Sequence, residues 1–157
     1  MEKNTAIPDD TDRHILRMLQ QNAMMTIKEM AEHLHLTSTP VFERVKRLER
    51  EGYIAGYSAL LDRRKAGLGM LVMCDVSLKE HNINFLEQFE NAVKDLPEVL
   101  ECYHLAGAYD YLLKVVVSDI DAYQRFIKER LAALENIGRV QSHFVMTEIK
   151  STTVLPV

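Results

Sequence analysis

The feature that most constrains this chain is a pair of short helical patterns within residues 26–52, separated by a polar turn. Thr26 is followed three residues later by Glu29, which predicts a capping box in which each side chain binds a backbone N–H of the first helical turn. Apolar side chains then fall on one face of the helix: Ile27, Met30, Ala31 and Leu34. The first pattern is therefore a short amphipathic helix.

The second helical pattern begins at Thr39 and Pro40, because threonine can cap a helix and proline fits its first turn. Gly52 is the predicted left-handed cap at its end. Three apolar side chains cluster within a narrow arc of this helix: Val41, Val45 and Leu48. Charged side chains are predicted to lie away from that arc: Glu43, Arg44, Arg47 and Arg50.

Two short helices joined by a tight turn, the second with one packing face and one cationic face, predict a helix-turn-helix that binds double-stranded DNA. The N-terminal half of the second helix reaches base edges in such motifs. Candidate base contacts are Ser38, Thr39, Glu43, Arg44 and Arg47. Lys46 and Arg50 lie further round or further along the helix, so we expect them to contact phosphates. The alternative is a solvated helix whose interspersed glutamates pair with its own cations.

A third helix is predicted upstream over residues 9–23, with Ile15, Leu16 and Leu19 on one face. Downstream of Gly52 the sequence YIAGYSALLD alternates, which predicts a hairpin or wing followed by an outgoing strand. Residues 1–62 are thus expected to form a winged helix-turn-helix domain, and residues 63–157 a second domain.

The second domain repeats a β-α-β pattern twice. Asn84 with Glu87 resembles a capping box at the start of its first helix, and residues 106–108 form the turn between the repeats. The expected strands and helices, in chain order, are residues 70–78 (strand), 84–96 (helix), 99–107 (strand), 109–118 (strand), 119–134 (helix) and 140–149 (strand). This order predicts an α+β, ferredoxin-like βαββαβ sheet with both helices on one face.

The uncovered face of that sheet must meet solvent, a ligand or another subunit. Leu112 and Leu113 are followed by three valines, so the strand is apolar on both faces. Subunit pairing explains this pattern, and a two-fold dimer also suits DNA recognition, because it reads two half-sites.

The formal net charge of −4 is unevenly distributed over the 157 residues. Residues 1–66 carry 11 basic and 10 acidic side chains, and the remainder carry 8 and 13, so only the first part offers a local positive patch for phosphates. The two cysteines, Cys74 and Cys102, are expected to be ordinary buried thiols. The apolar runs are only strand-length and the N-terminus lacks a hydrophobic signal core, so we expect a cytoplasmic protein without a membrane partner.

Enzyme motifs are scarce. His33 and His35 are two residues apart on a helical pattern and point in different directions, so we expect no catalytic site and no cofactor. Cys102 and His104 share one face of a strand and His143 lies on another strand, which keeps a metal or haem-like site open as an alternative.

With these motifs in place, the chain closely resembles the Lrp/AsnC family of transcription regulators, also called feast/famine regulators. Three segments carry the resemblance: DDTDRHIL, TSTPVFERVKRLEREGYIAGYSALLD and LAGAYDYLLKV. The resemblance implies a dimer, often assembled into tetramers or octamers, with a small amino acid bound between subunits.

The resemblance also implies an effector-binding turn in the second domain. The matching residues are Leu105, Ala106, Gly107, Ala108, Tyr109 and Asp110. Gly107 permits close approach, backbone N–H groups can bind a carboxylate, and Asp110 can bind an ammonium group. Many family members carry an acidic residue after the glycine, where this chain has Ala108. The alternative is a hairpin in which Gly107 and Asp110 only satisfy backbone geometry.

Two other functions are compatible with the sequence. One is a ligand-independent architectural DNA binder, in which the second domain is purely structural. The other is a tetrapyrrole-binding enzyme, because sirohaem decarboxylases resemble this regulator family in overall architecture.

Overall fold

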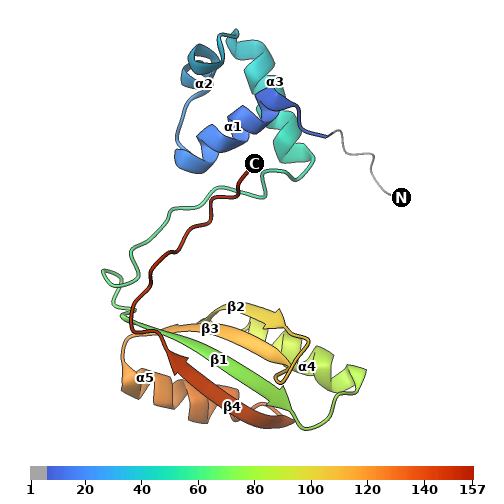
Figure 1. Cartoon of the computed structure of the whole chain (residues 1–157), viewed down its shortest axis with the longest axis vertical. Helices are drawn as coiled ribbons and strands as arrows, with labels where there is room; N and C mark the ends of the chain where they lie inside the picture. Colours follow the sequence, from blue (N-terminus) through green and yellow to red (C-terminus); the bar gives the residue numbers. More distant parts are fainter. Residues whose placement is uncertain (1–6) are drawn as a thin grey trace. The chain divides into compact units, whose positions relative to one another are not determined.

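The structure, a computed structural model, describes residues 7–157; residues 1–6, on which part of the expectation about a signal segment depends, lie outside it. The chain divides into two compact units. The helical unit comprises the described residues up to Leu60 together with Lys150–Val157, and the sheet unit comprises Leu61–Ile149 (Figure 1). Over residues 7–157, no helix has the length and apolar character needed to cross a membrane.

The helical unit contains three helices: α1 (Asp10–Gln21), α2 (Ile27–Leu34) and α3 (Ser38–Arg50) (Figure 1). Each helix contributes apolar side chains to one buried core, as the helical patterns predicted. That core consists of Ile15, Met18, Met30, Ala31, Val41, Val45 and Leu48. The predicted three-helix core is therefore confirmed.

The predicted caps around the turn are confirmed at two positions. The Thr26 N–H donates to Glu29 Oε2 at 2.6 Å, and the Glu29 N–H donates to Thr26 Oγ1 at 3.2 Å, which completes the capping box of α2. Gly52 follows α3 with φ of 82°, the left-handed conformation that favours glycine.

Other boundaries in the helical unit differ from the prediction. The N-cap of α3 is Thr37 rather than Thr39, and Pro40 is the third residue of the helix, where the absent N–H costs little because first-turn amides have no intrahelical acceptor. α1 ends at Gln21, two residues earlier than expected. Residues 53–62 contain no strand, because this extended segment joins no ladder of the described chain.

The sheet unit has the predicted ferredoxin-like order. Its strands are β1 (Met70–Leu78), β2 (Val99–His104), β3 (Tyr111–Val117) and β4 (Ile137–Phe144), arranged β2-β3-β1-β4 with antiparallel neighbours. Its helices are α4 (Ile83–Lys94), α5 (Ile120–Arg125) and the π-helical turn η1 (Phe126–Leu131). One core joins these helices to a single face of the sheet, with Val72, Cys74 and Val76 of β1 packed against Phe89 and Phe126. The opposite face is left open.

Several predicted bounds in the sheet unit were wrong: β2 ends at His104 rather than at residue 107, β3 begins at Tyr111 rather than at residue 109, and β4 ends at Phe144 rather than at residue 149. Asn84 caps nothing: Asn82 is the N-cap of α4 and accepts from the Phe85 N–H at 3.2 Å. The helix expected over residues 119–134 ends as the π-helical turn at Leu131, which keeps Phe126 and Leu131 buried. The last strand begins at Ile137, three residues earlier than expected, because it pairs with Leu78 at the end of β1.

Candidate nucleic-acid interface and effector turn

The outward face of α3 is mostly polar and cationic. Six side chains of this helix are exposed: Ser38, Thr39, Phe42, Glu43, Lys46 and Arg50. Five of them were predicted from the sequence as DNA contacts. The sixth, Phe42, was not, because an aromatic residue beside a packing arc is usually assigned to the core.

Arg44 and Arg47 lie elsewhere than predicted. Arg44 Nη1 is 2.8 Å from Asp12 Oδ1 and 2.7 Å from Asp9 Oδ2, and Arg47 Nη2 forms an ion pair with Asp12 Oδ2. Asp12 is only 1% exposed, so the carboxylate of α1 that both arginines of α3 contact is buried. The prediction that they lie away from the packed arc was wrong, because a long side chain at its margin can reach the neighbouring helix.

The charges in this cluster stabilise one another. The Asp12 N–H and the Arg44 guanidinium hold the pKa of Asp9 below its usual value. The carboxylates of Asp9 and Asp12 in turn raise the pKa of Arg44. Both shifts favour the charged forms of Asp9 and Arg44, and the ion pairs of the cluster tie the first turn of α1 to the middle of α3.

Sequence reasoning missed the role of Asp12, although a signal was present. Asp12 precedes Ile15 by three residues, which places an acidic side chain on the apolar stripe of α1. An acid on a packing face needs a partner, and long cationic side chains at the margin of the α3 packing arc could supply one.

The remaining cations of α3 make only local contacts. Lys46 Nζ is 2.7 Å from Glu49 Oε2, and Arg50 Nη2 is 3.9 Å from Glu51 Oε1. The Arg50 side chain is 73% exposed, which leaves it the most accessible cation of the helix. Exposed pairs of this kind contribute little and exchange readily for a phosphate.

The predicted effector turn connects β2 to β3. Residues 105–108 are exposed, and the Leu105 N–H donates to the Asp110 carbonyl at 2.7 Å, which closes the turn. Gly107 has open space around the position that a Cβ would take. The turn thus presents accessible backbone beside one acidic side chain.

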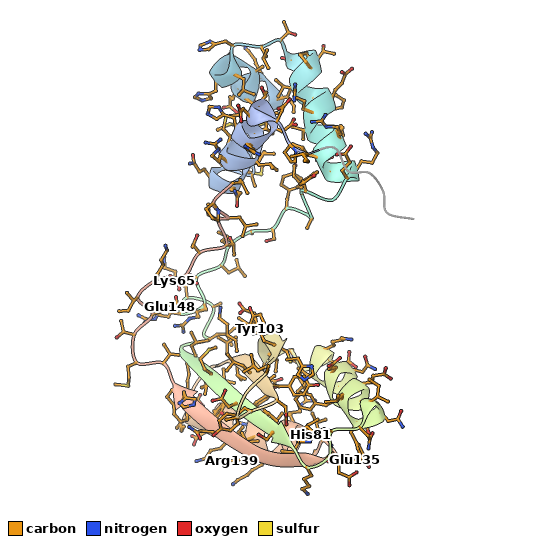
Figure 2. All side chains as sticks on the ribbon, turned by 45° about the vertical axis from the view of Figure 1, so that its right-hand side comes forward. Lys65, His81, Tyr103, Glu135, Arg139 and Glu148 are labelled. Atoms are coloured by element: carbon orange, nitrogen blue, oxygen red, sulfur yellow. The ribbon has the colours of Figure 1, made fainter. Side chains whose placement is uncertain are left out.

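Asp110 at the base of the turn already has protein partners. Its Oδ2 accepts from the Leu78 N–H at 2.7 Å, and His81 Nε2 lies 3.0 Å from both carboxylate oxygens. Figure 2 shows His81 where the chain leaves β1. Burial raises the pKa of Asp110, but the Leu78 and His81 hydrogen bonds outweigh it, so the net pKa lies below the usual value. The carboxylate is therefore charged and joins the turn to the end of β1.

Tyr109 links the turn to a polar network on the open sheet face. Its hydroxyl donates to Gln141 Oε1, and the Arg139 guanidinium lies 5.5 Å from its ring centroid. Figure 2 labels Arg139 on β4. Further along that strand, His143 Nε2 is 2.9 Å from Asp75 Oδ2. The open face is thus more polar than the apolar run of β3 had indicated.

The residues considered for a metal site do not converge. Cys102 and His104 pair across the ladder with Leu113 and Tyr111 of the buried core, so they belong to the helix-covered face. Cys102 is nevertheless exposed, so the prediction that both cysteines are buried is correct only for Cys74. His143 lies on the open face, where its side chain is hydrogen-bonded to Asp75. No cluster of three or more potential ligands from His, Cys, Asp and Glu occurs within residues 7–157.

A helix-turn-helix unit combined with a ferredoxin-like unit defines a class of regulators in which a DNA-binding domain and a ligand-binding domain share one chain. Family models match both parts. Residues 8–55 match a winged helix-turn-helix DNA-binding model, and residues 71–155 match the Lrp/AsnC ligand binding domain. The chain belongs to the Lrp/AsnC family of DNA-binding transcriptional regulators.

Individual relatives agree over nearly the whole length. The DNA-binding transcriptional activator DecR of Escherichia coli is 38% identical over 95% of this chain and 98% of its own. The leucine-responsive regulatory protein of Escherichia coli is 37% identical over 94% of this chain and 90% of its own. A regulator from Neisseria meningitidis, solved with L-Met, is 37% identical and superposes with a TM-score of 0.90 over 94% of this chain and 96% of that one.

Proposed function

We propose that α3 enters the major groove of double-stranded DNA with its exposed face. The observation that carries this proposal is that hydroxyl, carboxylate and cationic side chains occupy that face, with the packed core behind it. Base contacts are assigned to Ser38, Thr39 and Glu43 in the N-terminal half of the helix. Phosphate contacts are assigned to Lys46 and Arg50 further along it.

Arg44 and Arg47 are assigned a positioning role in this interface. Either side chain could reach a base edge only by leaving Asp12, and an unpaired carboxylate that is 1% exposed is costly. By holding α3 against α1, the two arginines set the angle at which the exposed residues meet the groove.

We further propose that the turn of residues 105–110 binds a small amino acid. The Neisseria meningitidis regulator was solved with L-Met, and the ligand-binding model covers this turn. The exposed amides beside Gly107 suit a carboxylate. Asp110 suits an ammonium group, because a carboxylate offers about four acceptor sites and the Leu78 and His81 contacts leave part of that capacity free.

Oligomerisation is the third part of the proposal. The open sheet face carries Met73 and Leu112 beside the hydrogen-bonded side chains of Asp75 and His143, a mixture that suits an interface between copies. We propose a homodimer that assembles further to tetramers or octamers. An effector would act by binding one assembly or one arrangement of the DNA-binding units more tightly than another.

These assignments give each part of the chain one task. Residues 1–62 would bind DNA, and residues 63–157 would form the oligomer and bind the effector. The relatives named above are regulators, which supports a function without catalysis.

Isothermal titration calorimetry with L-Met, L-Leu and the other common amino acids tests the effector site. We expect saturable heat with at least one of them, and loss of that heat in Asp110→Ala. Asp121→Ala is the control, because it removes an exposed carboxylate of the same unit and should bind normally. Heat that persists unchanged in Asp110→Ala would remove the turn from the binding site.

A further inference from the structure

Phe42 is an aromatic side chain of α3 that does not pack in the core of the helical unit. It is 49% exposed, and it belongs neither to the buried core nor to the partly buried side chains packed on that core. Its neighbour Val41 is fully buried in the same core. A half-exposed phenylalanine in the first half of α3 contributes little to folding, so its exposure points to a contact outside the chain.

The surroundings of Phe42 indicate what that contact is. Lys46 Nζ lies 5.8 Å from the ring centroid, one helical turn further along. Thr39 lies one turn earlier and is exposed as well. The ring is therefore an apolar spot between a hydroxyl and a cation, a combination that matches a thymine edge flanked by phosphates better than an apolar protein surface.

We propose that Phe42 reads sequence by packing its ring against the 5-methyl group of a thymine in the major groove. This inference rests on the proposed entry of α3 into that groove. The thymine methyl is the one apolar group that a base pair presents there, and phenylalanine is among the side chains that contact it. With Arg44 and Arg47 held by Asp12, Phe42 is the largest free side chain in the N-terminal half of the helix.

The consequence is a defined preference at one position of each half-site. Phe42 selects a T·A pair over pairs that lack the methyl group at that position. Replacement of thymine by uracil removes only this group and leaves all hydrogen-bonding groups in place, so it isolates the contact.

The test begins with duplexes selected from a randomised library by the full-length wild-type protein. Each thymine of the selected site is then replaced in turn by deoxyuridine, and Kd is measured by fluorescence anisotropy. At one thymine per half-site the wild-type protein should lose affinity by about 3- to 10-fold. Phe42→Ala should bind the thymine duplex with a similar loss and should no longer distinguish thymine from uracil there.

Two further variants keep the outcomes separate. Phe42→Leu keeps an apolar side chain and should retain part of the discrimination, whereas Glu32→Gln, a change at an exposed residue of α2, should retain all of it. If Phe42→Ala discriminates thymine from uracil as well as the wild-type protein at every position, the inference is overturned. If Thr39→Ala and Arg50→Ala also leave affinity unchanged, the entry of α3 into the groove fails as well, which is a different result.

A competing role for the ring is also decided by these variants. If Phe42→Ala changes the mass in light scattering and leaves thymine discrimination intact, the ring is a protein contact and the inference is overturned. An unchanged mass with lost discrimination supports it.

Discussion

Arg44 Nη1 lies 2.8 Å from Asp12 Oδ1, and this pair joins the middle of α3 to the first turn of α1. The carboxylate is 1% exposed, while the Arg44 side chain is 29% exposed. The contact is therefore a buried anchor with one solvated end. Together with the ion pair of Arg47 and Asp12, it gives two of the four cations of α3 a partner within the protein.

Loss of the Asp12 charge should destabilise the helical unit. Asp12→Asn keeps the shape and removes the partner of two guanidinium groups, and we expect the free energy of unfolding to fall by about 2 to 4 kcal/mol, because breaking a buried ion pair strands its partner. Urea denaturation measures the change. Asp10→Asn is the matched control, because its exposed carboxylate belongs to the same helix turn. Equal stability of the two variants would refute the anchor.

The left-handed cap after α3 offers a backbone test. Gly52 has φ of 82° with open space around its missing Cβ, so Gly52→Ala should cost about 1 kcal/mol through backbone strain alone. Gly56 has equally open surroundings without a positive φ, and Gly56→Ala should leave thermal unfolding nearly unchanged. If both substitutions have the same effect, the cap does not determine the end of α3.

The salt dependence of DNA binding should show whether Arg50, the most exposed cation of α3, contacts a phosphate. If Arg50 contacts a phosphate, Arg50→Ala should reduce the slope of log Kd against log salt by about 0.9 and weaken binding similarly for all sequences. Anisotropy titrations at several salt concentrations give the slope. Arg130→Ala, an equal charge change in the sheet unit, should leave it unaltered. A slope unchanged in Arg50→Ala would remove this residue from the phosphate contacts.

The hydrogen bonds of Asp110 predict a pH dependence of stability. Because its folded-state pKa lies below the usual value, the charged carboxylate stabilises the fold at neutral pH, and this contribution is lost as pH falls through the folded-state pKa. Asp110→Asn should therefore be less stable than the wild-type protein at pH 7 by about 1 kcal/mol, with the difference shrinking in acid.

A second substitution separates charge from hydrogen bonding at this position. Asp110→Ala also removes the acceptor of the Leu78 N–H, so it should lose additional stability at every pH. Chemical denaturation between pH 7 and pH 3 gives both curves. A constant gap between wild type and Asp110→Asn over this range would contradict the assigned cause.

Local signals explain what could be predicted from the sequence. The capping box of Thr26 and Glu29, and the bounds of β1, depend on residues a few positions apart, and both were predicted correctly. The ion pair of Arg44 with Asp12 joins positions 32 residues apart, and the helical period that places Asp12 on the packed face does not identify its partner. The same holds for His81 and Asp110, which meet only because β1 and β3 are neighbours in the sheet.

The open sheet face shows the limit of pattern reading. Leu112 follows the alternation that predicts an apolar second face, yet β1 places Asp75 directly opposite it, and β4, beyond β1, adds Gln141 and His143 to the same face. A face assembled from four strands has a composition that no single strand reveals. The polar network on this face depends on the register between strands, which the sequence pattern of one strand does not specify.

The central claim is that amino-acid binding in the sheet unit alters DNA binding by the helical unit. The most direct measurement is the Kd of the full-length protein for a selected duplex, with and without saturating L-Met and then each other common amino acid. We predict that at least one of them changes Kd by about 5-fold or more, the size of an ordinary allosteric coupling, and that Asp110→Ala abolishes the change. A Kd that no amino acid alters would contradict the account.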